Sequence, residues 1–177
     1  MRWMAVLAWI CGAAQAGPVP RLTLAEMADG SEYIIEATVL RSWTDWNAAD
    51  QPIWTHHELS VKEWLKAPGA AERTIVVSEP AGDVGYATTY TPGEYVLVLA
   101  WRTPEGFLRA AGAGQGKFTI TGFAGSHDQR VRWNPAIFRT LRDAREPDGY
   151  LDGMRLDDFK TYVRRLVRFE GERRSGE

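Results

Sequence analysis

Seven short runs rich in apolar and β-branched residues follow one another along the chain, and each predicts a β-strand. Clusters of Gly, Pro and Asp separate these runs, as is typical of turns. The most apolar run, at 95–101, predicts a strand buried on both faces at the centre of the sheet. The predicted strands lie at residues 33–40, 53–65, 74–78, 95–101, 107–110, 118–121 and 129–133.

Helical patterns flank the strands. Residues 23–26, Thr-Leu-Ala-Glu, form a capping box and predict a short helix that ends at residues 29–31. Asn134 and Pro135 are typical of an N-cap followed by the first helical residue, and they predict a helix over 135–144. Near the C-terminus, apolar residues recur at helical spacing and predict an amphipathic helix that docks one face: Leu156, Phe159, Val163 and Leu166.

This order of elements predicts a mainly β protein with flanking helices. We expect a small OB-like antiparallel β-barrel over about residues 33–133, with a C-terminal helical segment at about 134–170. We find no internal repeat, low-complexity tract or interdomain linker, so residues 17–177 are predicted to form a single domain.

The first sixteen residues have the pattern of a secretory signal peptide. Arg2 supplies a positive charge, residues 4–10 are apolar, and Ala14-Gln15-Ala16 has the small-x-small form of a cleavage site. We therefore expect cleavage after Ala16 and a secreted or periplasmic protein.

The single cysteine allows a second interpretation of this segment, as a lipoprotein signal in which Cys11 is lipidated. Trp9 and Ile10 are bulkier than the small residues that precede a lipidated cysteine. Cleavage after Ala16 would leave a chain without cysteine, which must be stabilised by its core instead of disulfides. No later stretch has the length of a transmembrane helix.

Composition and charge exclude several classes of protein. The 177 residues are 45% hydrophobic and 25% charged with a net charge of -2, which is typical of a globular domain and not of a disordered or fibrous chain.

Residues 17–115 hold 7 basic and 13 acidic residues, whereas residues 116–177 hold 13 basic and 10 acidic. A nucleic-acid-binding domain should be strongly basic overall, so we expect no nucleic-acid partner. The Arg-rich part is expected to pack against the acidic part or to form a solvated helix face, with a modest patch for an anionic partner as the alternative.

Catalytic and cofactor motifs are weak. The Gly-rich residues 112–117 lack the spacing of a P-loop. His56 and His57 are neighbours on a predicted strand and point to opposite faces, so one metal ion could not easily bind both. We therefore expect no metal and no cofactor, and we assign no catalytic residue. A hydrolase that uses His57 or His127 with a carboxylate remains an alternative.

Tryptophans provide the best candidate binding surface. Strict alternation over residues 53–65 puts Trp54, His56 and Trp64 on one face of the strand and His57 with Leu59 on the other. Such aromatic side chains can stack on sugar rings or anchor a protein partner. The alternative is that the last helix covers this face and that the tryptophans are packing residues, as we expect for Trp101. The candidate ligand-binding residues are Trp43, Trp46, Trp54, His56 and Trp64.

Six segments between residues 34–39 and 115–118 together resemble an uncharacterised group of secreted bacterial proteins. The group usually has Leu-Lys-Gly at the position of Leu65-Lys66-Ala67, and Pro-Gly-Gly at Pro80-Ala81-Gly82. The similar segments span about residues 33–120, at 34–39, 53–55, 61–66, 80–85, 92–99 and 115–118.

The strand order is also similar, more remotely, to the barrel of the tissue inhibitors of metalloproteinases, and this similarity implies a binding or inhibitory role on fold analogy alone. Those inhibitors chelate zinc through an N-terminal cysteine, whereas the processed chain would begin at Gly17, so no functional residue is transferred.

These patterns together predict an exported, non-enzymatic binding module. Its expected partner is a cell-envelope glycan or the surface of an extracytoplasmic protein. The alternative is a protease-inhibitor-like interaction module that presents an exposed loop, at residues 79–92.

Overall fold

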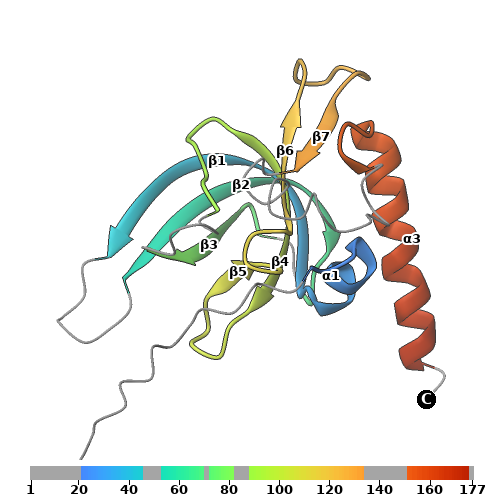
Figure 1. Cartoon of the computed structure of the whole chain (residues 1–177), viewed down its shortest axis with the longest axis horizontal. Coiled ribbons are helices and arrows are strands. Elements are labelled where there is room, and N and C mark those ends of the chain that lie inside the picture. The colour runs from blue at the N-terminus through green and yellow to red at the C-terminus, as the bar shows by residue number, and fades with distance from the viewer. Residues whose placement is uncertain (1–20, 46–52, 70–71, 82–87, 134–150, 176–177) are drawn as a thin grey trace, which may run out of the picture.

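The computed structural model describes residues 21–45, 53–69, 72–81, 88–133 and 151–175 (Figure 1). The predicted signal peptide, Trp46 and the predicted helix 135–144 lie outside the described residues. Within them, no helix is both long enough and apolar enough to span a membrane.

All seven predicted strands are present, so the prediction of a mainly β fold is confirmed. Two predicted helices are also present, α1 (Leu24–Gly30) and α3 (Leu156–Ser175). The strands are β1 (Tyr33–Asp45), β2 (Trp54–Lys66), β3 (Thr74–Pro80), β4 (Tyr95–Arg102), β5 (Leu108–Ala110), β6 (Lys117–Thr121) and β7 (Arg130–Trp133).

Five of the strands form a ring. The sheet has the order β1-β2-β3-β5-β4-β6-β7, and an additional pairing between β1 and β4 joins β1, β2, β3, β5 and β4 into that ring. Strands β6 and β7 extend from it as a projecting hairpin (Figure 1).

One pair in the ring differs from the expected antiparallel arrangement. Strands β3 and β5 are parallel and are joined through Val77 and Leu108. A ring with an odd number of strands cannot reverse direction at every step, so at least one neighbouring pair must be parallel. The sequence pattern does not reveal which strands close a ring.

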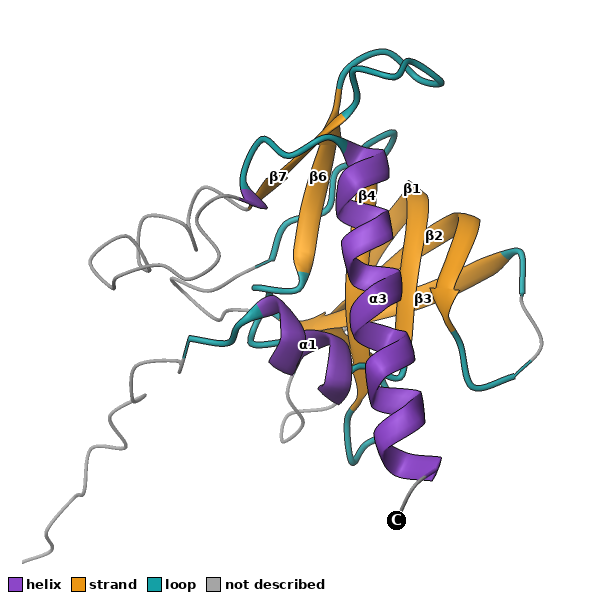
Figure 2. Ribbon diagram, turned by 90° about the vertical axis from the view of Figure 1, so that its right-hand side faces the viewer, coloured by secondary structure: helices purple, strands orange, loops and turns teal. Residues whose placement is uncertain are grey.

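The ring separates two hydrophobic cores. Inside it, Val96 and Val98 of β4 pack with residues from the other strands. Outside it, the alternate residues Leu97 and Leu99 pack against the two helices and the β6–β7 hairpin, so β4 is buried on both faces as its composition predicted. Figure 2 shows α1 and α3 together on this outer side of the sheet.

Helix α1 begins as the sequence predicts. The Thr23 side chain accepts a hydrogen bond from the Glu26 backbone at 3.2 Å, and the Glu26 carboxylate accepts one from the Thr23 backbone at 2.7 Å. This reciprocal capping box satisfies two backbone donors that a helix start leaves unpaired. It also fixes the approach of the preceding residue, Leu22, to the outer core.

Helix α3 docks through an apolar stripe that includes Leu156, Phe159 and Val163, as predicted from their spacing. Beside this stripe, Lys160 and Arg164 form ion pairs with Glu63 of β2. The prediction that the basic C-terminal part packs against the acidic part is therefore confirmed for these two residues.

Candidate functional site

A bulge in β2 separates the predicted tryptophans. Ala37 of β1 lies opposite Val61, but the next pair along is Glu36 with Glu63, so Lys62 is an extra residue in β2. Trp64 therefore lies opposite Ile35 and shares the face of Val61 that points into the ring. The predicted common face of Trp54, His56 and Trp64 is wrong, because one inserted residue exchanges the two faces of a strand.

The other predicted residues form an aromatic cluster at the far end of β2. Trp43 lies opposite His56, and their ring centroids are 5.4 Å apart in a stacked arrangement. The ring centroid of Phe107, just before β5, lies 4.7 Å from that of Trp54 and 5.6 Å from that of His56. Arg41 lies over the Trp43 ring, 5.1 Å from its centroid. These rings thus pack on one another and on a guanidinium group.

His56 is held between a carboxylate and a hydroxyl. Its Nε2 lies 3.1 Å from Asp45 Oδ2, and its Nδ1 lies 2.8 Å from the Ser78 hydroxyl. These three residue types are those of a serine-hydrolase triad, but Ser78 is only 1% exposed, so its hydroxyl cannot reach a substrate. The arrangement connects β1, β2 and β3 and fixes the aromatic cluster in place.

His57 is buried on the ring side of β2. Its Nδ1 lies 2.7 Å from the hydroxyl of Ser42, and its ring lies 4.4 Å from that of Tyr90. Burial, reinforced by the positive charge of Lys117, lowers the pKa of His57 to about 4. The imidazole is therefore neutral at pH 7.

Lys117 lies near His57, on the ring of Tyr90. Its ammonium donates to Glu94 at 2.7 Å and lies 4.8 Å from the centroid of the Tyr90 ring. Burial lowers the pKa of Lys117, while the Glu94 carboxylate acts in the opposite direction. Burial alone would raise the pKa of Glu94, but hydrogen bonds from Lys117 and Thr119 hold it below its usual value. This buried pair stabilises the start of β4 against β6.

The remaining histidine lies elsewhere. His127 is exposed in the turn between β6 and β7, and its backbone carbonyl accepts a hydrogen bond from Arg155 at 2.8 Å. His57, by contrast, is enclosed by the ring strands, and the two histidines do not form a common site. Across the described part of the chain, no three His, Cys, Asp or Glu side chains are placed to bind a metal ion.

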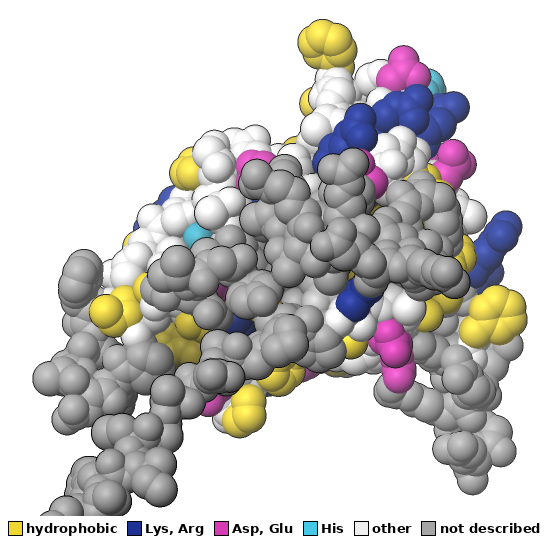
Figure 3. All heavy atoms as spheres, viewed as in Figure 1, with side chains coloured by type: hydrophobic (Ala, Val, Ile, Leu, Met, Phe, Trp, Pro, Cys, Tyr) yellow, Lys and Arg dark blue, Asp and Glu magenta, His cyan; other side chains and the backbone are white. Residues whose placement is uncertain are grey.

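Two arginines of β7 attach the projecting hairpin to the chain that precedes α3. Lys and Arg side chains gather beside β6 and β7 in the space-filling view (Figure 3). Arg130 donates to the carbonyl of Gly153 at 2.8 Å, and Arg132 forms an ion pair with Asp152 at 3.3 Å. These contacts tie the hairpin to the chain just before α3, so part of the basic charge serves the fold.

The predicted protruding loop 79–92 is only partly exposed where the structure describes it. Glu79 and Tyr90 are buried, whereas Thr91 and Pro92 are exposed. Glu79 accepts hydrogen bonds from Arg109 and from the backbone of Ala110, both at 3.1 Å. Glu79, which the structure places near the end of β3, therefore anchors β5.

Three adjoining hollows form a groove over α1, the start of β1 and the ends of β2 and β4. The first and second hollows share Gly30 and Trp101, and the second and third share Pro68 and Arg102. Their volumes are about 380, 540 and 470 Å³. We call this continuous surface, from Trp101 to Trp64, the Trp101–Trp64 groove.

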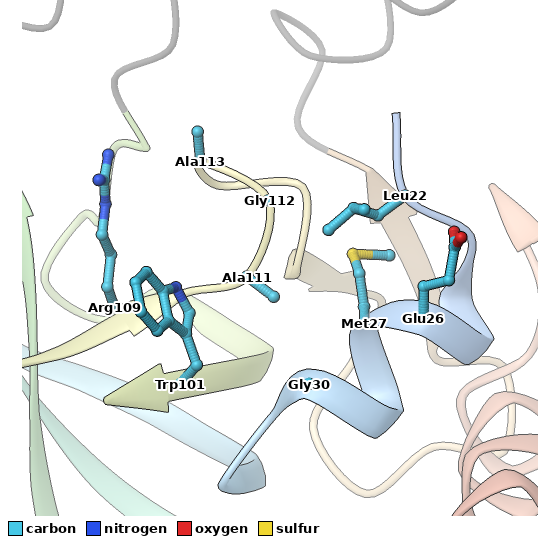
Figure 4. Close-up of a pocket in the computed structure, with 9 residues that line it drawn as sticks. All are labelled: Leu22, Glu26, Met27, Gly30, Trp101, Arg109, Ala111, Gly112 and Ala113. Atoms are coloured by element: carbon cyan, nitrogen blue, oxygen red, sulfur yellow. The ribbon is translucent and has the colours of Figure 1, made fainter. Parts of the chain in front are cut away.

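The first hollow is predominantly apolar. Figure 4 shows Leu22 directed toward the turn that follows β5, Met27 beside it, and Trp101 on the opposite wall. The complete lining is Leu22, Glu26, Met27, Gly30, Trp101, Arg109, Ala111, Gly112 and Ala113.

The second and third hollows are more polar. Arg102 forms an ion pair with Glu32 at 3.1 Å, and its guanidinium lies over the Tyr33 ring. Tyr33 contacts Trp64, whose indole nitrogen donates to the backbone carbonyl of Glu72 at 3.2 Å. This part of the groove therefore combines aromatic rings with a paired Arg102 and Glu32.

The groove includes one predicted residue, Trp64, and two aromatic residues that sequence reasoning did not select, Tyr33 and Trp101. Trp101 packs against the outer core, as predicted, but it is also partly exposed and lines the first two hollows. Its position at the end of β4, just before the charged Arg102, is the signal that could have indicated it.

No protein-family model matches the chain, and a search of curated proteins finds no match either.

Proposed function

We propose that the protein is an exported, non-enzymatic binding module that holds an extended saccharide in the Trp101–Trp64 groove. The main support is the series of three hollows in which Trp101, Tyr33 and Trp64 follow one another. A series of connected hollows suits a chain of several sugar units better than a single small ligand.

The chemistry of the groove is suited to sugars. Aromatic side chains combine an apolar face with a polar edge, and they can stack on the apolar face of a sugar ring. Arg102 and Glu32 are partly exposed and already paired, so they can exchange hydrogen bonds with hydroxyl groups without requiring a charged ligand.

The N-terminal sequence supports the location in this proposal. A signal peptide at residues 1–16 would deliver the protein to the periplasm or the exterior. The saccharide available there is a cell-envelope glycan, and an OB-like barrel is a known type of scaffold for oligosaccharides.

Titration with soluble saccharides tests the proposal. Chitohexaose and a soluble peptidoglycan tetrasaccharide would be added to the protein while its tryptophan fluorescence and the heat of binding are measured. We expect saturable binding that Trp101→Ala weakens at least tenfold, because one stacking surface is removed. Trp54→Ala, in the separate aromatic cluster, is the matched control and should bind normally. Saturable binding that both variants weaken equally, or no binding of either saccharide, would reject the groove.

A second candidate function is hydrolysis with Ser42 as the nucleophile. The observation in its favour is the 2.7 Å separation between the Ser42 hydroxyl and Nδ1 of a neutral His57. A fluorophosphonate reagent distinguishes the two candidates. Labelling that Ser42→Ala abolishes would support the hydrolase, whereas the binding module predicts no labelling.

A further inference from the structure

We infer that the ligand of the Trp101–Trp64 groove is amphipathic: a saccharide that bears an alkyl or acyl chain, with the chain in the first hollow. This inference rests on the proposed function and names the ligand class more narrowly. It follows from the contrast between the first hollow and the two that adjoin it.

The first hollow offers a ligand mostly apolar surface. Leu22, Met27, Trp101 and Ala111 supply its walls. Arg109 also lines the hollow, but its guanidinium is paired with Glu79 at 3.1 Å. Apolar surface of this kind favours hydrocarbon because water is released when the surface is covered.

The wall around Leu22 is built into the fold. Gln115 is buried, accepts a hydrogen bond from the Leu22 backbone at 3.0 Å, and donates one to the Gly112 carbonyl at 2.9 Å. Ala113 adopts a φ of 53°, a left-handed conformation that costs a non-glycine residue energy. Hydrogen bonds thus hold this turn in a defined shape, which is the mark of a pre-formed pocket.

The second hollow adjoins the first directly across Trp101 and Gly30 and has different chemistry. Two acidic and two basic residues line it, and Arg102 is paired there with Glu32. Lys66 donates to the backbone carbonyl of Ala28 at 2.7 Å. A neutral, hydroxyl-rich head group suits this balanced charge, and an attached chain would extend past Trp101 into the apolar hollow.

Alkyl maltosides with six, eight and ten carbons provide the test, each measured below its critical micelle concentration by calorimetry. Maltose and decanoate serve as the head group and the chain alone. Each buried CH₂ group is expected to tighten the Kd about fourfold until the hollow is filled. We expect decyl maltoside to bind more tightly than either maltose or decanoate.

Two substitutions test whether the alkyl chain of the ligand lies in the first hollow. Leu22→Asn places an amide in the apolar wall and should remove most of the dependence on chain length. Gly30→Phe places a ring where the first and second hollows meet and should block the entry of the alkyl chain. A Cβ at Gly30 meets no atom within 4 Å, so this variant should fold even if Leu22→Asn does not. Gly171→Phe, on α3 and outside the residues that line the three hollows, has equal room for a Cβ; it is the control and should keep the dependence on chain length.

The outcomes separate this inference from the proposed function. A Kd that does not change with chain length, or a dependence that survives both Leu22→Asn and Gly30→Phe, would overturn the amphipathic ligand. Equal binding of decanoate and decyl maltoside would also overturn it. Binding of chitohexaose, measured in parallel, would still support the saccharide groove in each of these cases, and its absence would reject the groove independently.

Discussion

The ammonium of Lys160 lies 2.7 Å from a carboxylate oxygen of Glu36 and attaches α3 to the ring. Glu63 lies directly opposite Glu36 on β2, and the same ammonium contacts it at 3.0 Å. Burial alone would raise the pKa of Glu63, but hydrogen bonds from Lys160 and Arg164 hold it below its usual value. Lys160 thus bridges two facing carboxylates of neighbouring strands, and Arg164 supplies the second positive charge.

Replacing Lys160 by methionine should destabilise the protein by about 3 kcal/mol, because buried Glu36 would lose its cation while Arg164 stays paired with Glu63. Urea denaturation followed by circular dichroism measures the change. Arg165→Met, at an exposed position of the same helix, is the matched control and should change stability by less than about 0.5 kcal/mol. A similar small effect for Lys160→Met would show that this contact does not hold α3.

Buried His57 should make stability depend on pH. Its pKa is about 4 in the folded protein and about 6.5 when unfolded. Between these values the unfolded chain binds a proton that the folded chain does not, so stability falls as the pH is lowered from 6.5 toward 4. The expected loss between pH 6.5 and 4.5 is about 2 kcal/mol. Urea denaturation at pH 6.5, 5.5 and 4.5 measures it.

Two variants assign this pH dependence. His57→Gln cannot take up the proton and should flatten the profile above pH 4.5, whatever its effect on overall stability. His127→Gln, in an exposed turn, should leave the profile unchanged. A profile that is equally steep in His57→Gln would attribute the titration to another group.

Gly116 should not tolerate a side chain. A Cβ there would lie 2.7 Å from the backbone oxygen of Leu99, a distance that requires the β4–β6 region to move. Gly116→Ala is expected to cost about 2 kcal/mol. Gly69→Ala, where a Cβ meets no atom within 4 Å, should leave the urea midpoint almost unchanged. Equal midpoints for the two variants would contradict the close approach.

Much of the fold could be predicted from the sequence because the determining signals are local. The Thr23–Glu26 capping box, the apolar 95–101 segment and the spacing of Leu156, Phe159 and Val163 each lie within one element. The parallel pair of β3 and β5 could not be predicted in this way, since it follows from closing five strands into a ring.

The candidate site was less predictable, because it depends on contacts between residues that are distant in sequence. Lys62 has no sequence feature that distinguishes a bulge from a regular strand position, and this one residue moved Trp64 to the other face of β2. The groove combines α1 with the ends of β2 and β4, which are distant in sequence. Trp101 therefore looked like the end of a buried strand until these elements were brought together.

The direct test of the groove is to block it where its first two hollows meet. Gly30→Phe would be compared with Gly171→Phe, which lies on α3, outside the residues that line the three hollows, and also has free space for a Cβ. Calorimetric titration with chitohexaose and with the peptidoglycan tetrasaccharide measures both variants beside the unmodified protein. We predict that Gly30→Phe weakens saccharide binding at least tenfold while Gly171→Phe binds normally. Unchanged affinity in Gly30→Phe would contradict the account.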